Sequence, residues 1–262
     1  MADTQIRFDD GAAYERQMGV WSRSVGVVFL DWLKPKPGLR WVDVGCGNGA
    51  FSQLLADRVA PARIDGIDPS EGQLAFARSR LPAALAEFRL GDAMSLPYAD
   101  RSFDAAAMAL VIVFIPEPAK AVAEMVRVAR PGAAVATYMW NFAANGMPTE
   151  AIIGEANAMG LVRPSFPSIA AANIDVLQGL WTAAGLSDVE TRTITVERRF
   201  EDFEEFWSVT SSVGSVAAMK KNLTAEKIEA LKARVHARVK PDSHGHVTIV
   251  SHANAVKGRV PA

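Results

Sequence analysis

LRWVDVGCGNG, residues 39–49, is the stretch from which the rest of the chain can be interpreted. Its first part, residues 39–45, predicts a strand that runs into a glycine turn, and residues 50–59 continue as a helix with Phe51, Leu54 and Leu55 on one side. Glycines at such a turn let a ligand approach the backbone closely. The start of a helix adds free N–H groups and the positive end of a dipole. The turn therefore predicts a ligand site, with a purely structural turn as the alternative.

The spacing of the glycines and one carboxylate narrow the kind of ligand. Gly45, Gly47 and Gly49 follow the pattern G-x-G-x-G, which differs from the G-x-G-x-x-G fingerprint of dinucleotide binding. Asp43 ends the predicted strand. A carboxylate at that point repels a pyrophosphate and attracts an ammonium or a sulfonium group. Both features disfavour a nicotinamide-dependent dehydrogenase.

Strands and helices alternate on both sides of this stretch. An apolar stripe with spacings of three and four predicts a helix over residues 14–32, and Ser70-Glu71-Gly72-Gln73 matches a capping box that opens another. Pro118 lies in the first turn of a further predicted helix. The other strands are predicted at 62–68, 87–90, 103–110 and 133–140. This alternation predicts a parallel sheet with helices on both faces.

The alternation changes after Asn141. Helices are predicted over 149–161, 174–184, 202–220 and 224–239, and strands over 188–200 and 246–260. We expect one domain, 1–262, with an N-terminal helical cover, 1–38, and a core formed by 39–140, 185–200 and 246–262. The insertions 141–184 and 201–245 are expected to form a helical lid above the site.

Composition excludes several classes of protein. The chain has 262 residues, 50% of them hydrophobic, which is enough to bury a sizeable core. Its net charge of -1 lacks the basic footprint of a nucleic-acid-binding protein. The single cysteine excludes an intramolecular disulfide and a multi-cysteine zinc site. The first ten residues predict no secretory signal, and the longest apolar run, Ala105–Ile115, is too short for a membrane span, so we expect a cytoplasmic protein.

Three acidic residues end three successive predicted strands. Asp43 ends the first strand, Asp68 the second and Asp92 the third. Ligands of open α/β sheets bind at the carboxyl ends of the strands, where an acidic residue can bind ribose hydroxyls. The alternative is a set of solvated loop residues, which the order and spacing of all three disfavour.

Four segments together resemble a known family. VDVGCGNGAF (42–51), GIDPS (66–70), GDAMSLPYADRSFDAA (91–106) and RPGAAVATYMW (130–140) are similar to the ordered motifs of class I S-adenosylmethionine-dependent methyltransferases. The resemblance is closest to the small-molecule branch that includes the ubiquinone/menaquinone C-methyltransferases, methyltransferase type 11. It implies a doubly wound, mostly parallel seven-stranded sheet. The last strand would be antiparallel, with 188–200 as strand six and 246–260 as strand seven.

The resemblance also implies a cofactor, S-adenosyl-L-methionine, whose product is S-adenosyl-L-homocysteine, and a set of residues that bind it. Asp43, Gly45, Cys46 and Gly47 would line its methionine end, with Leu110 and Val111 close by. Asp68 would bind the ribose, and the adenine would lie beside Pro69, Ser70, Gln73, Asp92 and Ala93. Tyr14, Met18 and Arg23 lie where this branch often closes a helix over the cofactor, and Arg23 could meet its carboxylate bidentately.

The sequence contains fewer indications of the methyl acceptor than of the cofactor. We find no convincing general base and no metal site, because His236 falls on a polar helix face and His244, His246 and His252 have no acidic partner at fixed spacing. Trp140 and Asn141 either face the acceptor or pack at a strand end. An aromatic cluster at helical spacing predicts core packing or, alternatively, an apolar acceptor pocket: Phe200, Phe203, Phe206 and Trp207.

The sequence thus predicts an enzyme that transfers a methyl group from S-adenosylmethionine to a small, partly apolar molecule, as a monomer or homodimer. The alternative is a non-catalytic S-adenosylmethionine-binding sensor or a subunit of an assembly, which the missing base keeps open. Nucleic-acid methylation is disfavoured by the net charge and by the absence of an Asn/Asp-Pro-Pro-aromatic tetrapeptide.

Overall fold

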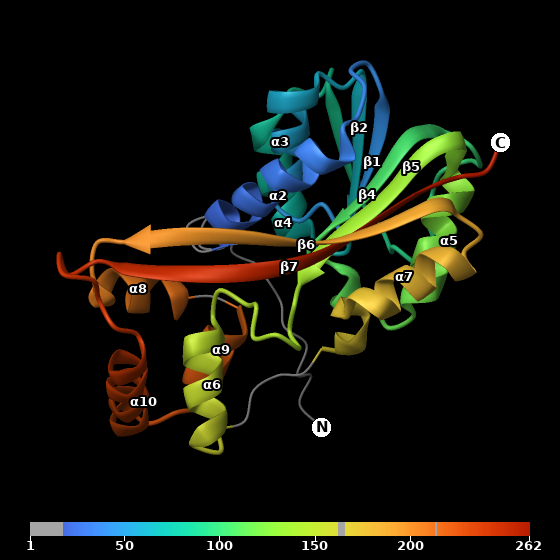
Figure 1. The fold of residues 1–262 in the computed structure, drawn as a ribbon. Helices are drawn as coiled ribbons and strands as arrows, with labels where there is room; N and C mark the ends of the chain where they lie inside the picture. Colours follow the sequence, from blue (N-terminus) through green and yellow to red (C-terminus); the bar gives the residue numbers. More distant parts are fainter. Residues whose placement is uncertain (1–17, 162–165, 213) are drawn as a thin grey trace.

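The computed structural model describes residues 18–161, 166–212 and 214–262, and a seven-stranded sheet runs through their centre (Figure 1). The order of the strands is β3-β2-β1-β4-β5-β7-β6. Strands β1 to β5 are parallel, and β7 is antiparallel to both of its neighbours. The bounds are β1 (Arg40–Val44), β2 (Arg63–Asp68), β3 (Ala86–Leu90), β4 (Phe103–Ala109), β5 (Ala129–Trp140), β6 (Ser187–Phe200) and β7 (Val247–Arg259). The predicted sheet, including its antiparallel last strand, is confirmed.

Helices cover both faces of this sheet, as the alternation predicts. On one side lie α2 (Val20–Leu33), α3 (Ala50–Val59) and α4 (Glu71–Arg80), and on the other α5 (Pro118–Val128) and α7 (Ile174–Ala183) (Figure 1). Ser70 caps α4, because its Oγ accepts a hydrogen bond from the backbone N–H of Gln73 at 3.4 Å. Because β1 and β4 are buried almost throughout, the core lies between the two helical layers and the sheet.

The structure corrects two predicted elements. Strand β5 begins at Ala129, four residues earlier than predicted, because the chain enters the sheet as soon as α5 ends at Val128. The single helix predicted over 202–220 is two helices, α8 (Phe203–Thr210) and α9 (Gly214–Lys220). A φ of +67° at Gly214 is incompatible with a continuous right-handed helix and separates them.

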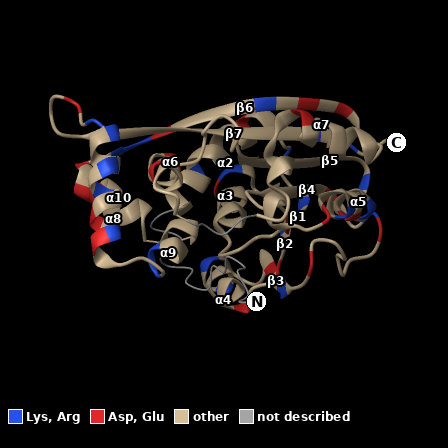
Figure 2. Ribbon diagram, turned by 90° about the horizontal axis from the view of Figure 1, so that it is seen from below, with Lys and Arg blue, Asp and Glu red and all other residues tan. Residues whose placement is uncertain are grey.

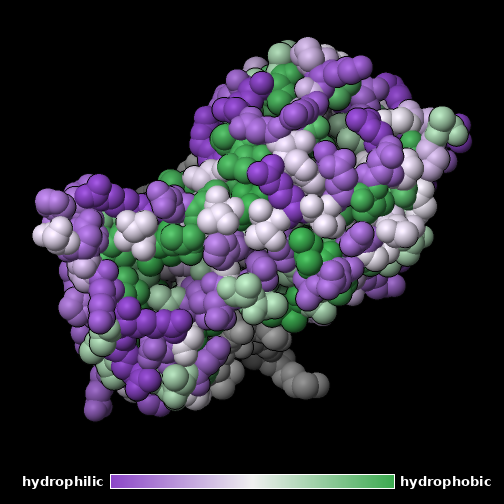
Figure 3. Space-filling view, viewed as in Figure 1, coloured by the Kyte–Doolittle hydropathy of each residue, from purple (hydrophilic) through white to green (hydrophobic). Residues whose placement is uncertain are grey.

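Strands β6 and β7 extend as a two-stranded ribbon beyond the rest of the sheet. They pair with each other from Val247 to Arg259, whereas β5 reaches only Ala253–Arg259 of β7. Helices α6 (Glu150–Ala158), α8, α9 and α10 (Ala225–Arg238) gather beneath the ribbon (Figure 1). Glu155 of α6 and Arg234 of α10 form an ion pair at 2.9 Å. In the space-filling view, hydrophobic side chains lie along the ribbon and immediately below it (Figure 3).

Helix α7 belongs to the core and not to the lid predicted over 141–184. It packs against β6 and β7, and the indole Nε1 of Trp181 donates a hydrogen bond to the backbone oxygen of Val135 at 2.8 Å. The part of that insertion that leaves the sheet is therefore the segment around α6. Whether α6 and α8–α10 close over the site stays a prediction.

Charges of both signs are distributed over the outer elements. Figure 2 shows blue and red residues side by side on α10, and the face seen in that view is not uniformly basic. In the part of the chain that the structure describes, no helix is long and apolar enough to cross a membrane.

Candidate functional site

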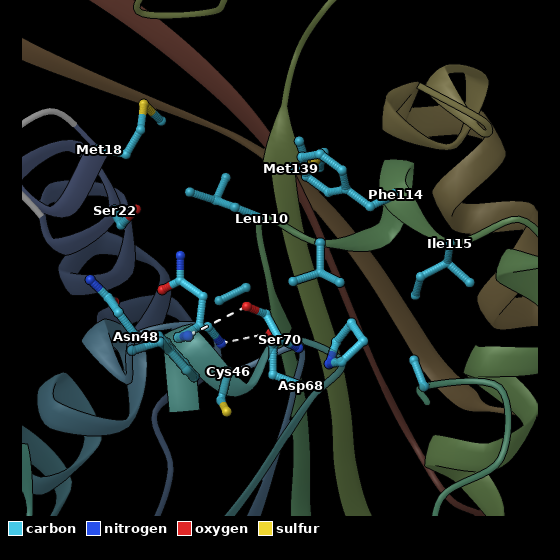
Figure 4. Close-up of a pocket in the computed structure, with 18 of the residues that line it drawn as sticks. Met18, Ser22, Cys46, Asn48, Asp68, Ser70, Leu110, Phe114, Ile115 and Met139 are labelled. Carbon is cyan, nitrogen blue, oxygen red and sulfur yellow. Dashed lines mark hydrogen bonds between the residues drawn. The ribbon is translucent and has the colours of Figure 1, made fainter. Parts of the chain in front are cut away.

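A cavity of ≈ 1060 Å³ opens at the carboxyl ends of the parallel strands β1 to β5. Its walls come from the turns that follow these strands and from α2 (Figure 4). The segments around α6 and α9 complete them. A pocket of this size can hold a cofactor together with a small molecule. Its two halves differ in chemistry, so we describe them separately.

The acidic half lies over β1, β2 and β3 and is built around the glycine turn. The backbone N–H groups of Gly45 and Cys46 donate to the backbone oxygen of Ile67 at 2.7 and 3.0 Å, which fixes the turn to β2. Gly45 has φ +72°, and a Cβ at this residue would lie 2.5 Å from Cγ2 of Val111. Gly47 has φ +52°, but a Cβ there would meet no atom within 4 Å. Only the second glycine therefore leaves open space for a ligand.

Asp68 holds the turn and the start of α4 together. One carboxylate oxygen accepts from the N–H of Gly47 at 2.9 Å and the other from the N–H of Ser70 at 2.9 Å (Figure 4). Burial raises the pKa of this carboxyl, and the two backbone hydrogen bonds oppose that shift. Because each carboxylate oxygen has a second lone pair, Asp68 can still accept hydrogen bonds from ligand hydroxyls.

Asp43 is a fully buried carboxyl at the end of β1. Its Oδ2 accepts a hydrogen bond from the hydroxyl of Ser52 at 2.6 Å, whereas Oδ1 is buried with no partner. Its pKa is raised to about 7, chiefly by burial and to a smaller degree by the nearby Asp68, while the hydrogen bonds from Ser52 oppose the shift. A cationic group in the cavity would stabilise the ionised form of Asp43.

The remaining residues of the acidic half follow β2 and β3. Asp92 is exposed, and its Oδ1 accepts from the N–H of Met94 at 2.8 Å. The neighbouring lining residues that the sequence predicted are also brought here: Pro69, Ser70, Gln73 and Ala93. The acidic half thus presents carboxylates on three successive strand ends, as expected from the sequence.

The apolar half lies over β4 and β5. Leu110 follows β4 with φ +62°, a backbone conformation that turns the chain sharply, and Val111 packs against the glycine turn. Phe166 contacts the rings of Phe114 and Phe142 edge-on, with centroids 5.1 and 5.2 Å apart. The other lining side chains of this half include Met139, Trp140, Met147 and Thr149. Sequence reasoning missed Phe114, Phe142, Met147 and Phe166, because they lie in connections without periodicity. It also missed Thr149, because the start of a predicted helix does not by itself indicate contact with a cavity.

Of the other residues that the sequence predicted for the site, some line the cavity and others do not. Met18 lines the cavity (Figure 4), but Arg23 does not: it is exposed and pairs with Asp57 of α3 at 3.1 Å. Cys46 also lines the cavity (Figure 4), and its largely buried sulfur would lie 2.9 Å from a Cβ at Gly66, below the turn. Tyr14 lies outside the described residues. Asn141 is also absent from the cavity wall and hydrogen-bonds Asn254 at 3.4 Å.

The aromatic cluster at the start of α8 is a packing cluster. Phe206 contacts Phe200 and Phe203 with centroids 5.4 and 6.0 Å apart, and Phe203 stacks on Trp207. None of these four side chains lines the cavity. The interpretation as core packing is therefore confirmed. Among the described ranges, no three His, Cys, Asp or Glu side chains are grouped so that they could hold a metal ion.

Comparison with known proteins identifies one segment of the chain. Residues 42–137 match the methyltransferase domain family. The chain is 40% identical over 108 residues to a demethylmenaquinone methyltransferase of Desulfitobacterium hafniense, a match that covers 39% of this chain and 43% of that protein. It is 38% identical over 107 residues to a ubiquinone/menaquinone biosynthesis C-methyltransferase of Paracoccus denitrificans, covering 39% and 43%. These matches thus span less than half the length of either relative.

Solved structures resemble the chain over more of its length. A putative methyltransferase from Bacillus halodurans superposes with a TM-score of 0.60 at 18% identity, covering 90% of this chain and 99% of that one. A phosphoethanolamine N-methyltransferase 2 of Haemonchus contortus superposes with a TM-score of 0.61 at 18% identity, covering 98% and 59%. These likenesses show that the chain shares the fold of these structures over most of its length.

Proposed function

We propose that this chain, whose residues 42–137 match the methyltransferase domain family, is a class I S-adenosylmethionine-dependent methyltransferase that transfers a methyl group to a small molecule. The observation that carries the proposal is the division of one cavity into an acidic half with a glycine turn and an apolar half. The acidic half suits a cationic nucleoside, and the apolar half suits a second molecule. Cytoplasmic location and the monomeric or homodimeric state stay predictions.

The residues of the acidic half fit the cofactor. The unpaired Oδ1 of buried Asp43 provides negative charge for the methionine end, and Asp68 keeps lone pairs for the ribose hydroxyls. The open space at Gly47 lets the ligand lie against the backbone. We assign cofactor binding to these residues and to their neighbours on the wall: Met18, Gly45, Pro69, Ser70, Gln73, Asp92, Ala93, Leu110 and Val111.

A bound cofactor would supply a methyl group on a positively charged sulfur. The sulfur would leave as a neutral thioether once a lone pair of the acceptor had formed the new bond to the methyl carbon. The protein contributes position: both halves of the cavity meet at Leu110 and Val111, so two molecules can be held in line. The apolar half excludes water from the region of transfer. No His, Lys or Arg of the described part of the chain lines the cavity, so none of these side chains is placed to take a proton from the acceptor.

Incubation with S-adenosylmethionine labelled in the methyl group tests this proposal. Purified protein is combined with a panel of small phenols, carbon acids and amines, and labelled products are separated by chromatography. We expect a labelled product from the wild-type protein and none from Gly47→Val. Tight S-adenosylhomocysteine binding without transfer to any acceptor would instead favour the non-catalytic binder.

A further inference from the structure

In the described part of the chain, β6 has the longest strand edge without a neighbouring strand. The two outer strands of the sheet are β6, with 14 residues, and β3, with 5. Strand β6 pairs only with β7, and in Figure 2 it lies along the outer margin of the molecule with α7 beside it. A long exposed edge of this kind can pair with a strand of another chain.

The hydrogen bonds of β7 show which residues of β6 face that edge. In an antiparallel ladder, the N–H and C=O of one residue point to the same neighbouring strand, and successive residues alternate. The backbone oxygen of His252 accepts from the N–H of Asn141 at 2.8 Å, and the N–H of Val260 donates to the oxygen of Ala133 at 3.0 Å. The even-numbered residues of β7 therefore face β5, and its odd-numbered residues face β6.

The register of β6 and β7 then places the even-numbered residues of β6 in the ladder. Ile194 lies opposite Ala253, and Val196 lies opposite Ser251. The residues between and around them direct their N–H and C=O groups away from the sheet: Thr191, Thr193, Thr195, Glu197 and Arg199. Among the described residues, none forms a hydrogen bond to these outward backbone groups. This edge can therefore accept a further strand without any change in the existing sheet.

Little in the middle of β6 protects this edge from pairing. Natural edge strands are commonly short, or interrupted by a bulge, a proline or charged side chains. The bulge of β6 lies at its beginning, between Ser187 and Glu190. The segment 191–196, TRTITV, contains no proline and a single charged residue. Threonine, isoleucine and valine favour extended strands, so this segment is well suited to pair on both sides.

The charges of β6 lie near its two ends and differ in sign. Asp188 and Glu190 are near its beginning, whereas Arg198 and Arg199 are near its end, next to Glu197. Antiparallel pairing of two copies brings each acidic end beside a basic end, and parallel pairing would bring like ends together. Because opposite charges across strands are favourable and like charges are not, the antiparallel arrangement is favoured.

The same charges select one register. Two copies related by a two-fold axis perpendicular to the sheet present the same face, so even-numbered residues lie opposite even-numbered ones. With Ile194 on the axis, Glu190 lies opposite Arg198 of the second copy, and Thr193 lies opposite Thr195. Pairs of opposite charge and pairs of threonines both stabilise neighbouring strands.

We propose that this chain forms a homodimer in which the β6 strands of two copies pair antiparallel about Ile194 and join the two seven-stranded sheets into one. With Thr195 on the axis, Arg192 would lie opposite Arg198 of the second copy, and like charges at that distance are unfavourable. With Thr193 on the axis, Glu190 would lie opposite an uncharged residue. The proposal does not depend on the proposed function.

Sedimentation velocity over a range of protein concentrations tests the proposal, with Thr195→Pro as the first variant. We expect the wild-type protein to form a reversible dimer. Proline at this position removes an N–H that points away from β7, so the β6–β7 ladder is kept while the second strand is blocked. The dissociation constant of the dimer should rise more than about tenfold.

Leu90→Pro is the matched control, because it changes the other edge strand in the same way. The N–H of Gly91 donates to the oxygen of Asp68 at 3.1 Å, so Gly91 faces β2 and Leu90, which is 59% exposed, faces outward. We expect this variant to dimerise as the wild type does. Thermal unfolding of both proline variants checks that each retains the fold.

Cysteine substitution tests the register. A residue on the two-fold axis lies opposite its own copy, with the two Cα atoms about 4.5 Å apart, which is within reach of a disulfide. Ile194→Cys should therefore give a covalent dimer on mild oxidation. In Thr193→Cys and Thr195→Cys the two copies would be about 7–8 Å apart and should not be linked. The wild type is the control, since its Cys46 is buried.

Charge reversal tests the contact between the two ends of the strand. Glu190→Arg and Arg198→Glu should each raise the dissociation constant by about fivefold, and the combined variant should restore it. Within one chain, Glu190 also pairs with Lys257 at 3.2 Å, and Arg198 lies over the ring of Phe200. The combined variant loses both of these contacts as well, so its recovery would come from pairing between copies.

Four results would overturn the proposal. They are a monomer at every concentration, a dimer as tight in Thr195→Pro as in Leu90→Pro, a combined charge variant no tighter than the single variants, and faster cross-linking at Thr193 or Thr195 than at Ile194. A dimer that survives Thr195→Pro would place the interface elsewhere on the molecule.

Discussion

The two halves of the cavity differ in how their residues are held and in where they come from along the chain. The acidic half takes its main residues from positions 43–93, and backbone hydrogen bonds fix them, as Gly47 and Ser70 fix Asp68. The residues of the apolar half come from several segments between 109 and 215, and packing between their side chains holds them in place. Residues close together in the sequence can therefore determine cofactor recognition, whereas acceptor recognition depends on tertiary packing between distant segments.

The largest effect is expected where the acidic half depends on open space. A Cβ built at Gly47 would meet no protein atom within 4 Å, so Gly47→Val fills this open space with a branched side chain. We therefore expect the affinity for S-adenosylhomocysteine to fall more than about 100-fold. The measurement is calorimetric titration. Gly132→Val is the matched control, because Gly132 also has positive φ and open space but does not line the cavity.

Both valine variants should lose similar stability from backbone strain, about 1–2 kcal/mol, as measured by denaturant unfolding. Only Gly47→Val should lose binding. Equal binding by the two variants would mean that the ligand does not lie against the glycine turn.

The next effect concerns the carboxylate that holds the turn. Asp68→Ala removes two hydrogen bonds to backbone N–H groups and the acceptor for ligand hydroxyls, so we expect S-adenosylhomocysteine binding to weaken by about 1–3 kcal/mol. Asp104→Ala serves as the control: its carboxylate also accepts a backbone hydrogen bond, from Arg40 at 2.9 Å, but lies away from the cavity. Unchanged affinity in Asp68→Ala would contradict its assignment to the ribose.

Asp43 adds a pH dependence to the acidic half. Burial raises its pKa from 3.8 to about 7, so the ligand-free native state binds this proton more tightly than the unfolded chain. Its contribution to stability is therefore present below about pH 4 and is lost as the pH rises through about 7. Relative to Asp43→Asn, the wild type should lose on the order of 3 kcal/mol across this range in denaturant unfolding.

Binding of a cationic ligand should show the opposite trend. S-adenosylmethionine favours the ionised carboxylate, so its affinity for the wild type should rise about tenfold from pH 6 to pH 8. Titrations of Asp43→Asn under the same conditions provide the reference. The role of Asp43 would be refuted by identical pH profiles of the wild type and this variant.

The smallest effect on cofactor binding is expected from the apolar half. Phe142→Ala removes a ring that contacts Phe166, so the KM for an acceptor should rise several-fold while S-adenosylhomocysteine affinity stays within about twofold. Steady-state kinetics and calorimetry separate the two quantities. A large loss of cofactor affinity would show that the halves are not independent.

The sequence predicted the acidic half well because each of its residues follows a strand whose position is set by hydrophobic pattern. Asp43, Asp68 and Asp92 reach one edge because parallel strands end there together. Arg23 shows that the resemblance to a family does not place every residue correctly. It is two residues from the buried Trp21, which places it about 200° around the helix, on the exposed face.

The apolar half could not be predicted in the same way. Phe142 lies in a connection without periodicity, and Phe166 reaches it and Phe114 only through ring contacts. The aromatic residues that do have helical spacing, such as Phe203 and Phe206, pack beneath the ribbon instead. Spacing along a helix indicates that a face is buried, but not what that face contacts.

Calorimetric titration of the wild-type protein with S-adenosylhomocysteine, S-adenosylmethionine and NADH tests the central claim most directly. The claim is that the acidic half is a site for a cationic adenosyl cofactor. We expect micromolar binding of both adenosyl ligands and no binding of NADH, whose pyrophosphate would meet Asp43 and Asp68. A folded protein that binds neither adenosyl ligand, or that binds NADH equally well, would contradict it.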